Sequence, residues 1–104
     1  MANIGSFTVV LPQATTPIIQ NISIAAANTE QSYVIPNGTK WFEITSRGKK
    51  AIIKYSYTSG QSGTVYREIY TGQTHTKEYL NIDGVTLYFQ SSAVGAILEI
   101  EAWK

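Results

Sequence analysis

Hydrophobic and polar residues alternate along most of the chain with the period of two that is typical of half-buried β-strands. In residues 40–46, Phe42 and Ile44 fall on one face and Trp41 falls on the other. Residues 96–103 alternate in the same way, and Gly, Pro, Asn or Asp residues flank the segments as turn signals. Seven segments carry the pattern: residues 21–25, 31–36, 40–46, 51–58, 64–70, 84–90 and 96–103.

The pattern predicts an all-β fold. Residues 25–31 are the best helical candidate, but the segment is short and has no apolar stripe. Short strands spaced about ten residues apart indicate a β-sandwich or a barrel, which periodicity alone does not separate. At this chain length we expect a single small antiparallel β-sandwich of seven or eight strands over residues 17–104, with jelly-roll connections as one option.

Residues 1–16 precede this predicted domain and have a strand-like pattern of their own. Phe7, Val9 and Leu11 alternate, and the pattern breaks at Pro12 and Pro17. The segment is either a first strand of the domain or an arm that adds to a neighbour's sheet by strand pairing. For the arm, the predicted contact residues are Ile4, Phe7, Val9 and Leu11.

The stretch YTSGQSGTVY, residues 57–66, carries two glycines and raises the question of a phosphate-binding loop. Such a loop needs a lysine followed by Ser or Thr and then a helix. Here Gly63 is followed by Thr64 and Val65, which extend a strand pattern. We therefore predict a hairpin of about five loop residues, whose exposed tip could serve as a contact point.

Composition and charge narrow the function classes. The chain has 43% hydrophobic and 14% charged residues, a net charge of +1 and no cysteine. The hydrophobic content and low net charge indicate a folded domain. The lack of cysteine excludes disulfide bonds, thiolate chemistry and zinc sites with cysteine ligands. One small cluster of basic residues is present, made up of Arg47, Lys49, Lys50 and Lys54, and it is too small to indicate nucleic-acid binding. With no signal-peptide pattern and no membrane-length apolar run, we expect synthesis in the cytoplasm and no membrane partner.

The sequence offers little catalytic or metal-binding material. His75 is the single histidine and Asp83 the single aspartate. A triad of these residues with Ser62 or Ser91 has no supporting motif, so we interpret His75 as a surface residue at the start of a strand. Glu99 and Glu101 share a strand face because they are two residues apart, and we expect that face to be solvated. We predict no enzymatic activity, cofactor or metal site.

Aromatic residues on the polar faces of the predicted strands are the most informative oddity. Trp41 and Trp103 lie opposite the apolar faces of their strands, as do Tyr66, Tyr70 and Tyr88. Exposed aromatic residues in this number indicate either an interface or a sugar-stacking platform. The alternative is that close packing of a small sandwich partly buries them. We predict Trp41 and Trp103 as interface residues.

Residues 33–103 resemble small virion proteins of tailed bacteriophages. The shared phrases are IPNGT at residues 35–39, AIIKYSYTSGQSGTVY at 51–66, GVTLYFQS at 84–91 and LEIEAW at 98–103, where the family pattern has Val in place of Leu98. The resemblance covers about two thirds of the chain and includes no catalytic motif. It implies a non-enzymatic β-sandwich that assembles in many copies on a virion.

The resemblance also implies a role and partners. It favours a capsid decoration or cement protein that binds the major capsid protein or another virion protein, as a homo-oligomer with a trimer favoured. A tail, collar or fibre component is the next possibility. A carbohydrate-binding module, with loops 60–63 and 72–75 setting specificity, is the alternative from another class.

Overall fold

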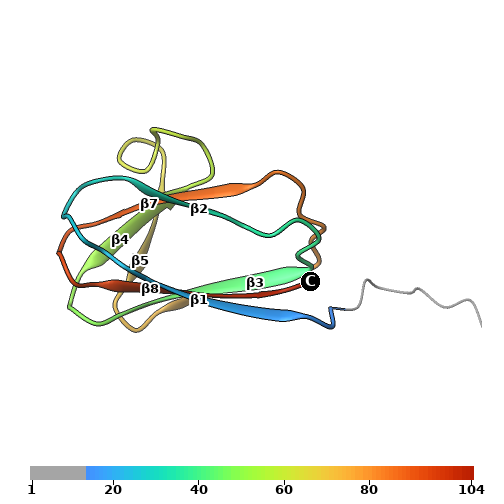
Figure 1. Cartoon of the computed structure of the whole chain (residues 1–104). Coiled ribbons are helices and arrows are strands. Elements are labelled where there is room, and N and C mark those ends of the chain that lie inside the picture. Colours follow the sequence, from blue (N-terminus) through green and yellow to red (C-terminus); the bar gives the residue numbers. More distant parts are fainter. Residues whose placement is uncertain (1–13) are drawn as a thin grey trace, which may run out of the picture.

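A computed structural model describes residues 14–104 of the chain as eight β-strands, with no helix among these residues (Figure 1). The strands are β1 (Pro17–Ser23), β2 (Gln31–Val34), β3 (Trp41–Arg47), β4 (Ile52–Ser56), β5 (Arg67–Tyr70), β6 (Thr74–Lys77), β7 (Thr86–Ser91) and β8 (Ile97–Trp103). The all-β prediction is confirmed. The predicted contact residues Ile4, Phe7, Val9 and Leu11 lie outside the described residues.

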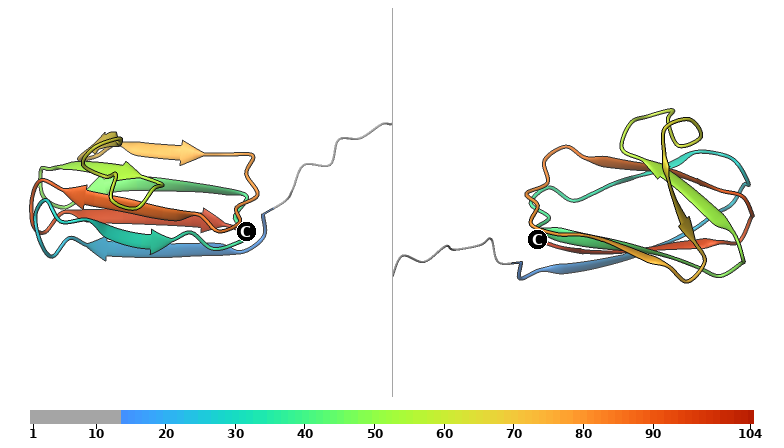
Figure 2. Two further views of the ribbon diagram at one scale, coloured as in Figure 1. Left: turned by 90° about the horizontal axis from the view of Figure 1, so that it is seen from above. Right: turned by 180° about the vertical axis from the view of Figure 1, so that it is seen from behind.

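The strands form two antiparallel sheets of four that face each other (Figures 1 and 2). The first sheet has the order β1-β8-β3-β6 and the second has the order β2-β7-β4-β5. The chain crosses between the sheets at every connection except the hairpin from β4 to β5. This strand order is that of an eight-stranded jelly roll, so the sandwich prediction is confirmed in preference to the barrel.

The core lies between the two sheets and is supplied by alternate residues of the strands. Along β8, for example, side chains alternate between half-buried and buried from Ile97 to Trp103. Each sheet thus turns one apolar face inward, which is the main source of its stability. The buried apolar residues are Ile24, Ile35, Phe42, Ile44, Ala51, Ile53, Tyr55, Ile69, Leu87, Phe89, Ala96, Leu98, Ile100 and Ala102.

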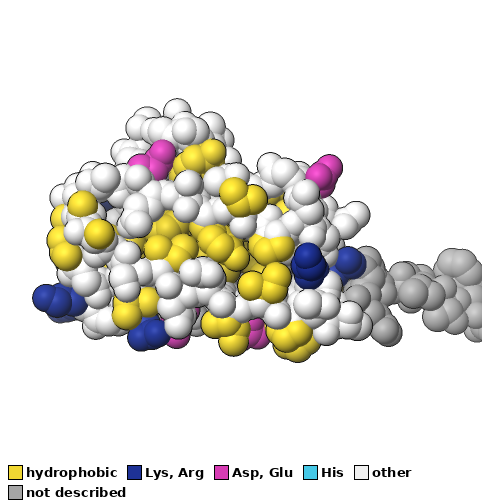
Figure 3. Space-filling model, in the orientation of Figure 1, with side chains coloured by type: hydrophobic (Ala, Val, Ile, Leu, Met, Phe, Trp, Pro, Cys, Tyr) yellow, Lys and Arg dark blue, Asp and Glu magenta, His cyan; other side chains and the backbone are white. Residues whose placement is uncertain are grey.

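The sandwich is open along the side where the edge strands β1 and β2 lie. Figure 3 looks onto this side, and hydrophobic side chains gather in the band between the two strands. Ile22 on β1 and Tyr33 on β2 are half-buried and pack against the core. The core is therefore less completely covered here than in the middle of the sheets.

Three expectations about the strands need correction. The first segment was expected at residues 21–25, whereas β1 spans Pro17–Ser23. Residues 64–66 do not extend a strand; β5 begins at Arg67, and the loop from β4 spans the ten residues 57–66 instead of about five. In addition, β6 is missing from the seven segments with the alternating pattern, and it was anticipated only by the interpretation that His75 starts a strand. It is short and polar, and it is defined by its pairing with residues 42–45 of β3.

The loop of residues 57–66 is held by a carboxylate from a distant part of the chain. Glu30, just before β2, accepts hydrogen bonds from the Gly60 N–H at 2.8 Å, the Ser62 N–H at 3.1 Å and the Ser62 hydroxyl at 2.5 Å. Ser62 is buried by this contact. The hydrogen bonds from Ser62 and Gly60 hold the pKa of Glu30 below its ordinary value. The loop therefore forms an ordered protrusion above the second sheet (Figure 2).

Candidate interface on the outer face of the first sheet

The outward side chains of β3 and β8 stand opposite one another in the middle of the first sheet. Even-numbered residues of both strands point into the core, so the odd-numbered residues point out. We call this surface the tryptophan face. Its cross-strand pairs are Trp41 with Trp103, Glu43 with Glu101, Thr45 with Glu99 and Arg47 with Ile97.

Trp41 and Trp103 form a stacked pair at one end of this face. Their ring centroids are 5.9 Å apart and the ring planes differ by 14°. Both side chains are half-buried, so part of each ring remains open to solvent. Direct opposition in an antiparallel pair brings the two side chains within reach of each other, and offset stacking is a preferred arrangement for aromatic rings. The prediction that both tryptophans lie opposite the core is confirmed.

A hydrogen bond along β8 fixes the second indole. The Nε1–H of Trp103 donates to Oε2 of Glu101 at 2.8 Å. The two residues are two positions apart on one strand and therefore share a face. The bond satisfies the indole donor and orients the Glu101 carboxylate beside the aromatic pair.

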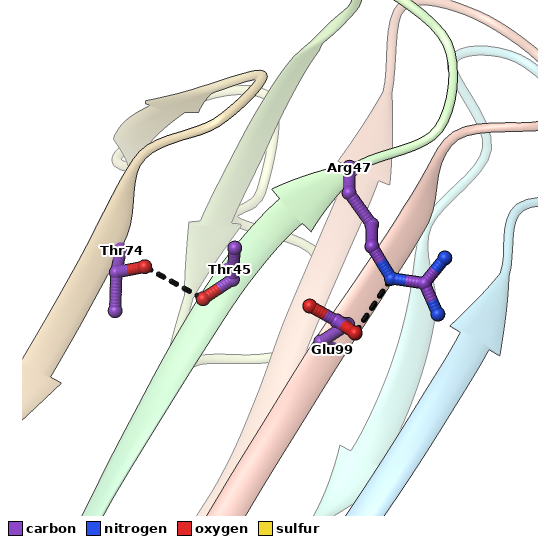
Figure 4. A network of polar contacts seen from close by, with 4 residues as sticks. All are labelled: Thr45, Arg47, Thr74 and Glu99. Atoms are coloured by element: carbon purple, nitrogen blue, oxygen red, sulfur yellow. Dashed lines mark hydrogen bonds and ion pairs between the residues drawn. The ribbon is translucent and has the colours of Figure 1, made fainter.

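Polar contacts cover the other end of the face (Figure 4). Arg47 Nε lies 2.6 Å from Glu99 Oε2, with the two side chains 45% and 37% exposed. The hydroxyls of Thr45 and Thr74 are 2.7 Å apart and join β3 to β6. Exposed pairs of this kind contribute roughly 0–1 kcal/mol, so this end is solvated surface. Glu99 and Glu101 point outward as expected, but both are half-buried, so this face of β8 is only partly solvated.

Between these ends, Glu43 on β3 pairs in backbone register with Glu101 on β8. The contacts of the two carboxylates point in different directions. Oε2 of Glu101 accepts from the Trp103 indole on its own strand, and Oε2 of Glu43 is 3.4 Å from the Thr76 hydroxyl on β6. Among residues 14–104 the one ion pair is that of Arg47 with Glu99, so neither Glu43 nor Glu101 forms an ion pair within the described chain.

An open hollow of about 460 Å³ lies beside Trp41, at the edge of the first sheet. It forms where the chain leaves β6 and returns toward β3, with the Leu80 N–H donating to the Lys40 carbonyl at 2.8 Å. Tyr79 stands in this return with a φ of +58° and is 79% exposed. A positive φ is uncommon for a bulky residue and marks local strain. The lining residues are Lys40, Trp41, Glu43, Thr76, Glu78, Tyr79 and Leu80.

The carboxylate of Glu43, which lines the hollow, makes only a weak hydrogen-bond contact within the described chain. Thr76 Oγ1 is 3.4 Å from Glu43 Oε2, a long contact. Lys40 Nζ donates to the Gly38 carbonyl at 2.9 Å. Sequence analysis singled out Trp41 but missed the rest of the lining, because the segment from Thr76 to Leu80 shows no period and its approach to β3 is a long-range contact.

The residues considered for catalysis lie apart. His75 bonds to Tyr55, Ser62 bonds to Glu30, and the Ser91 hydroxyl donates to the Ala93 carbonyl. His75 lies at the start of β6, as predicted, and is half-buried there. Among the described residues, no three His, Cys, Asp or Glu side chains are placed to hold a metal ion.

The loops assigned to sugar specificity also lie apart. Residues 60–63 belong to the protrusion above the second sheet, whereas residues 72–75 comprise the end of the β5–β6 turn and the first two residues of β6. The outward tyrosines Tyr66, Tyr70 and Tyr88 belong to the second sheet and its loop, with Lys54 Nζ 4.7 Å from the centre of the Tyr66 ring. Aromatic residues therefore occur on both outer faces, but the stacked tryptophans occur on the first.

Comparison with known proteins gives a weak structural likeness. No protein-family model and no curated protein matches the sequence. The solution NMR structure of a de novo designed double-stranded β-helix is similar with a TM-score of 0.48 and 16% identity, covering 86% of this chain and all of that one. Within residues 14–104, no helix has the length and apolar character needed to cross a membrane.

Proposed function

We propose that the protein is a non-enzymatic structural component of a bacteriophage virion, most simply a capsid decoration or cement protein, and that it docks through the tryptophan face. The observation that carries the docking is the Trp41–Trp103 stack, which presents partly exposed aromatic surface on a regular sheet. Tryptophan is enriched among the residues that dominate binding energy at protein interfaces. A stack held by a sheet loses little conformational freedom on binding.

The virion setting is supported by the sequence resemblance of residues 33–103 and by the fold class. Jelly rolls are common in viral capsid proteins and in lectins. Fold likeness of this kind is an argument by analogy, so the proposal depends on the binding surface for its test. We propose the major capsid protein or another virion protein as the partner.

Assembly into a homo-oligomer, with a trimer favoured, completes the proposed mechanism. One sheet face buries a modest area, and linked copies raise the overall affinity through effective concentration. Native mass spectrometry of the full chain at low micromolar concentration tests this part. A discrete trimer supports it, and a monomer that persists when bound to particles contradicts it.

The docking test uses virion particles from which the protein has been removed. Full-length protein is added back, and occupancy is measured by co-sedimentation and quantitative mass spectrometry. We expect Trp41→Ala with Trp103→Ala to weaken binding at least about 30-fold, which is the effect of losing one strong interface residue. Thr45→Ala with Thr74→Ala is the matched control on the same face and should bind normally. Equal binding by the tryptophan variant would contradict the docking surface.

A carbohydrate-binding module is the second candidate. The hollow beside Trp41 favours it, because aromatic rings next to hydroxyl and carboxylate groups are common in small-molecule sites. A glycan array with the full chain tests this candidate, with Trp41→Ala as the control. Retained glycan binding by Trp41→Ala would place a sugar site elsewhere.

A further inference from the structure

We propose that the hollow beside Trp41 accepts the guanidinium group of an arginine side chain from the protein to which this chain docks. The inference rests on the proposed docking function and gives it a partner chemistry. The walls of the hollow supply the two kinds of group that a guanidinium prefers. Trp41 and Tyr79 offer aromatic rings, and Glu43 and Glu78 offer carboxylates.

The aromatic wall is open to a ligand. Trp41 stacks with Trp103 and also lines the hollow, so part of its indole is available on that side. Tyr79 is 79% exposed and is held out by a strained backbone with a φ of +58°. Arginine stacks on aromatic faces and is attracted by the ring quadrupole.

The charge of the hollow favours a cation. Glu43 and Glu78 stand against one basic residue, Lys40, whose ammonium group is engaged with the Gly38 carbonyl. Neither Glu43 nor Glu78 forms an ion pair within residues 14–104. The lining therefore carries more negative than positive charge, which attracts a cation but not an uncharged sugar, and so we favour a cationic ligand over a saccharide.

A guanidinium fits better than a compact ammonium. Its planar set of donors can bond a carboxylate at two points while one face stacks on a ring. The partner residue would then be neutralised by acidic groups and packed on an aromatic surface, which is the environment of many arginine anchors at interfaces.

The test is an NMR titration of the ¹⁵N-labelled full chain, in which the indole N–H signals of the two tryptophans are followed. The probe is N-acetyl-arginine methylamide, and N-acetyl-citrulline methylamide is the uncharged control of the same shape. We expect the Trp41 signal to move with a dissociation constant on the order of 10 mM, weakening as salt is added. The citrulline probe should leave it in place.

Variants assign the contacts. Glu43→Gln with Glu78→Gln should weaken binding of the arginine probe by about tenfold, and Glu99→Gln, on the same face but outside the hollow, should leave it unchanged. Tyr79→Asn removes the ring with a residue that tolerates a positive φ, and should also weaken binding. An unmoved Trp41 signal, equal shifts from the citrulline probe, or saturation by a methyl glycoside instead would each overturn the proposal.

Particle binding separates this inference from the docking proposal. If re-binding to stripped particles needs the tryptophans but not Glu43 and Glu78, the docking surface stands and the arginine contact is wrong. If the arginine probe binds to the hollow but neither set of substitutions affects particle binding, the site stands and the proposed function is wrong. Loss of particle binding in both the tryptophan variant and the glutamate variant supports both the docking surface and the arginine contact.

Discussion

Tyr55 and His75 join the two sheets by a hydrogen bond between the Tyr55 hydroxyl and His75 Nδ1, which are 2.6 Å apart. Tyr55 is on β4 of the second sheet and is 1% exposed, whereas His75 is on β6 of the first sheet. Burial raises the pKa of Tyr55 and so keeps its hydroxyl protonated. The neutral His75 tautomer with its proton on Nε2 then accepts at Nδ1. The bond satisfies the polar end of a core tyrosine.

This contact leads us to expect that stability declines as the pH falls below about 6.5. Burial, followed by the charges of Arg67 and Lys77, lowers the pKa of His75 below 6.5 in the folded chain. A lowered folded-state pKa gives stability that is complete above the unfolded value and is lost as the pH falls through the folded one. Urea unfolding between pH 7.5 and pH 5 measures the decline.

The variant His75→Gln serves as the control for this pH dependence. His75 is the single histidine of the chain, and the lowered pKa of Glu30 places any loss from that carboxylate below its ordinary value of 4.5. The variant should therefore show a flatter profile between pH 6.5 and pH 5. An unchanged slope would show that another group is responsible.

Removing the Tyr55 hydroxyl tests the same bond from the other sheet. Tyr55→Phe leaves His75 Nδ1 without its partner at a half-buried position, and we expect a loss of about 1–2 kcal/mol in the free energy of unfolding. Tyr57→Phe is the matched control. Its ring packs edge-to-face on Tyr55 at 6.2 Å, and burial raises the pKa of Tyr57 to about 12. The bond to His75 is intact in this control, so a loss equal to that of Tyr55→Phe would contradict the role of the bond.

The sequence pattern predicted the strands whose two faces differ clearly. Phe42 and Ile44, or Leu98 and Ile100, alternate with polar residues, and burial of one face follows directly from that alternation. It did not predict β6, whose residues are polar on both faces and which exists through its pairing with β3. The predicted length of the loop between β4 and β5 was also too short. Thr64 and Val65 have strand propensity and were assigned to the strand, but the carboxylate of Glu30, 30 residues before Gly60, holds the loop in which they lie.

The candidate site was predictable in part for the same reason. Period-two alternation placed Trp41 and Trp103 on outward faces. Their stacking depends on the register of β3 against β8, which residues far apart in the sequence determine. The hollow depends further on the left-handed backbone of Tyr79, for which no local sequence signal exists.

The contact of Glu30 with the loop should set the order of residues 57–66. Glu30→Ala leaves the Ser62 amide and hydroxyl without their acceptor, and we expect a loss of about 1–3 kcal/mol with faster hydrogen exchange at Gly60 and Ser62. Glu68→Gln is the control, because Glu68 accepts one exposed hydrogen bond from Tyr70. Protection of the Gly60 and Ser62 amides that survives Glu30→Ala would contradict the contact.

The Trp41–Trp103 stack should be energetically coupled in the isolated chain. A double-mutant cycle with Trp41→Ala, Trp103→Ala and the double variant should give a coupling of about 0.5–1.5 kcal/mol in urea unfolding. A parallel cycle on Thr45 and Thr74, whose hydroxyls meet in the open, should give a smaller coupling. The Trp103 bond to Glu101 is common to the wild type and Trp41→Ala, so the cycle isolates the ring contact.

The size of that coupling bears directly on how the face binds. A coupled stack exists before any partner binds, so the two large side chains are already ordered. Docking then avoids the free-energy cost of immobilising them, which is roughly 0.5–1.5 kcal/mol for each side chain. Additive losses in the cycle would mean that the rings stabilise the sheet independently. The binding surface would then have to form on contact, and substitution of either tryptophan alone should weaken particle binding nearly as much as substitution of both.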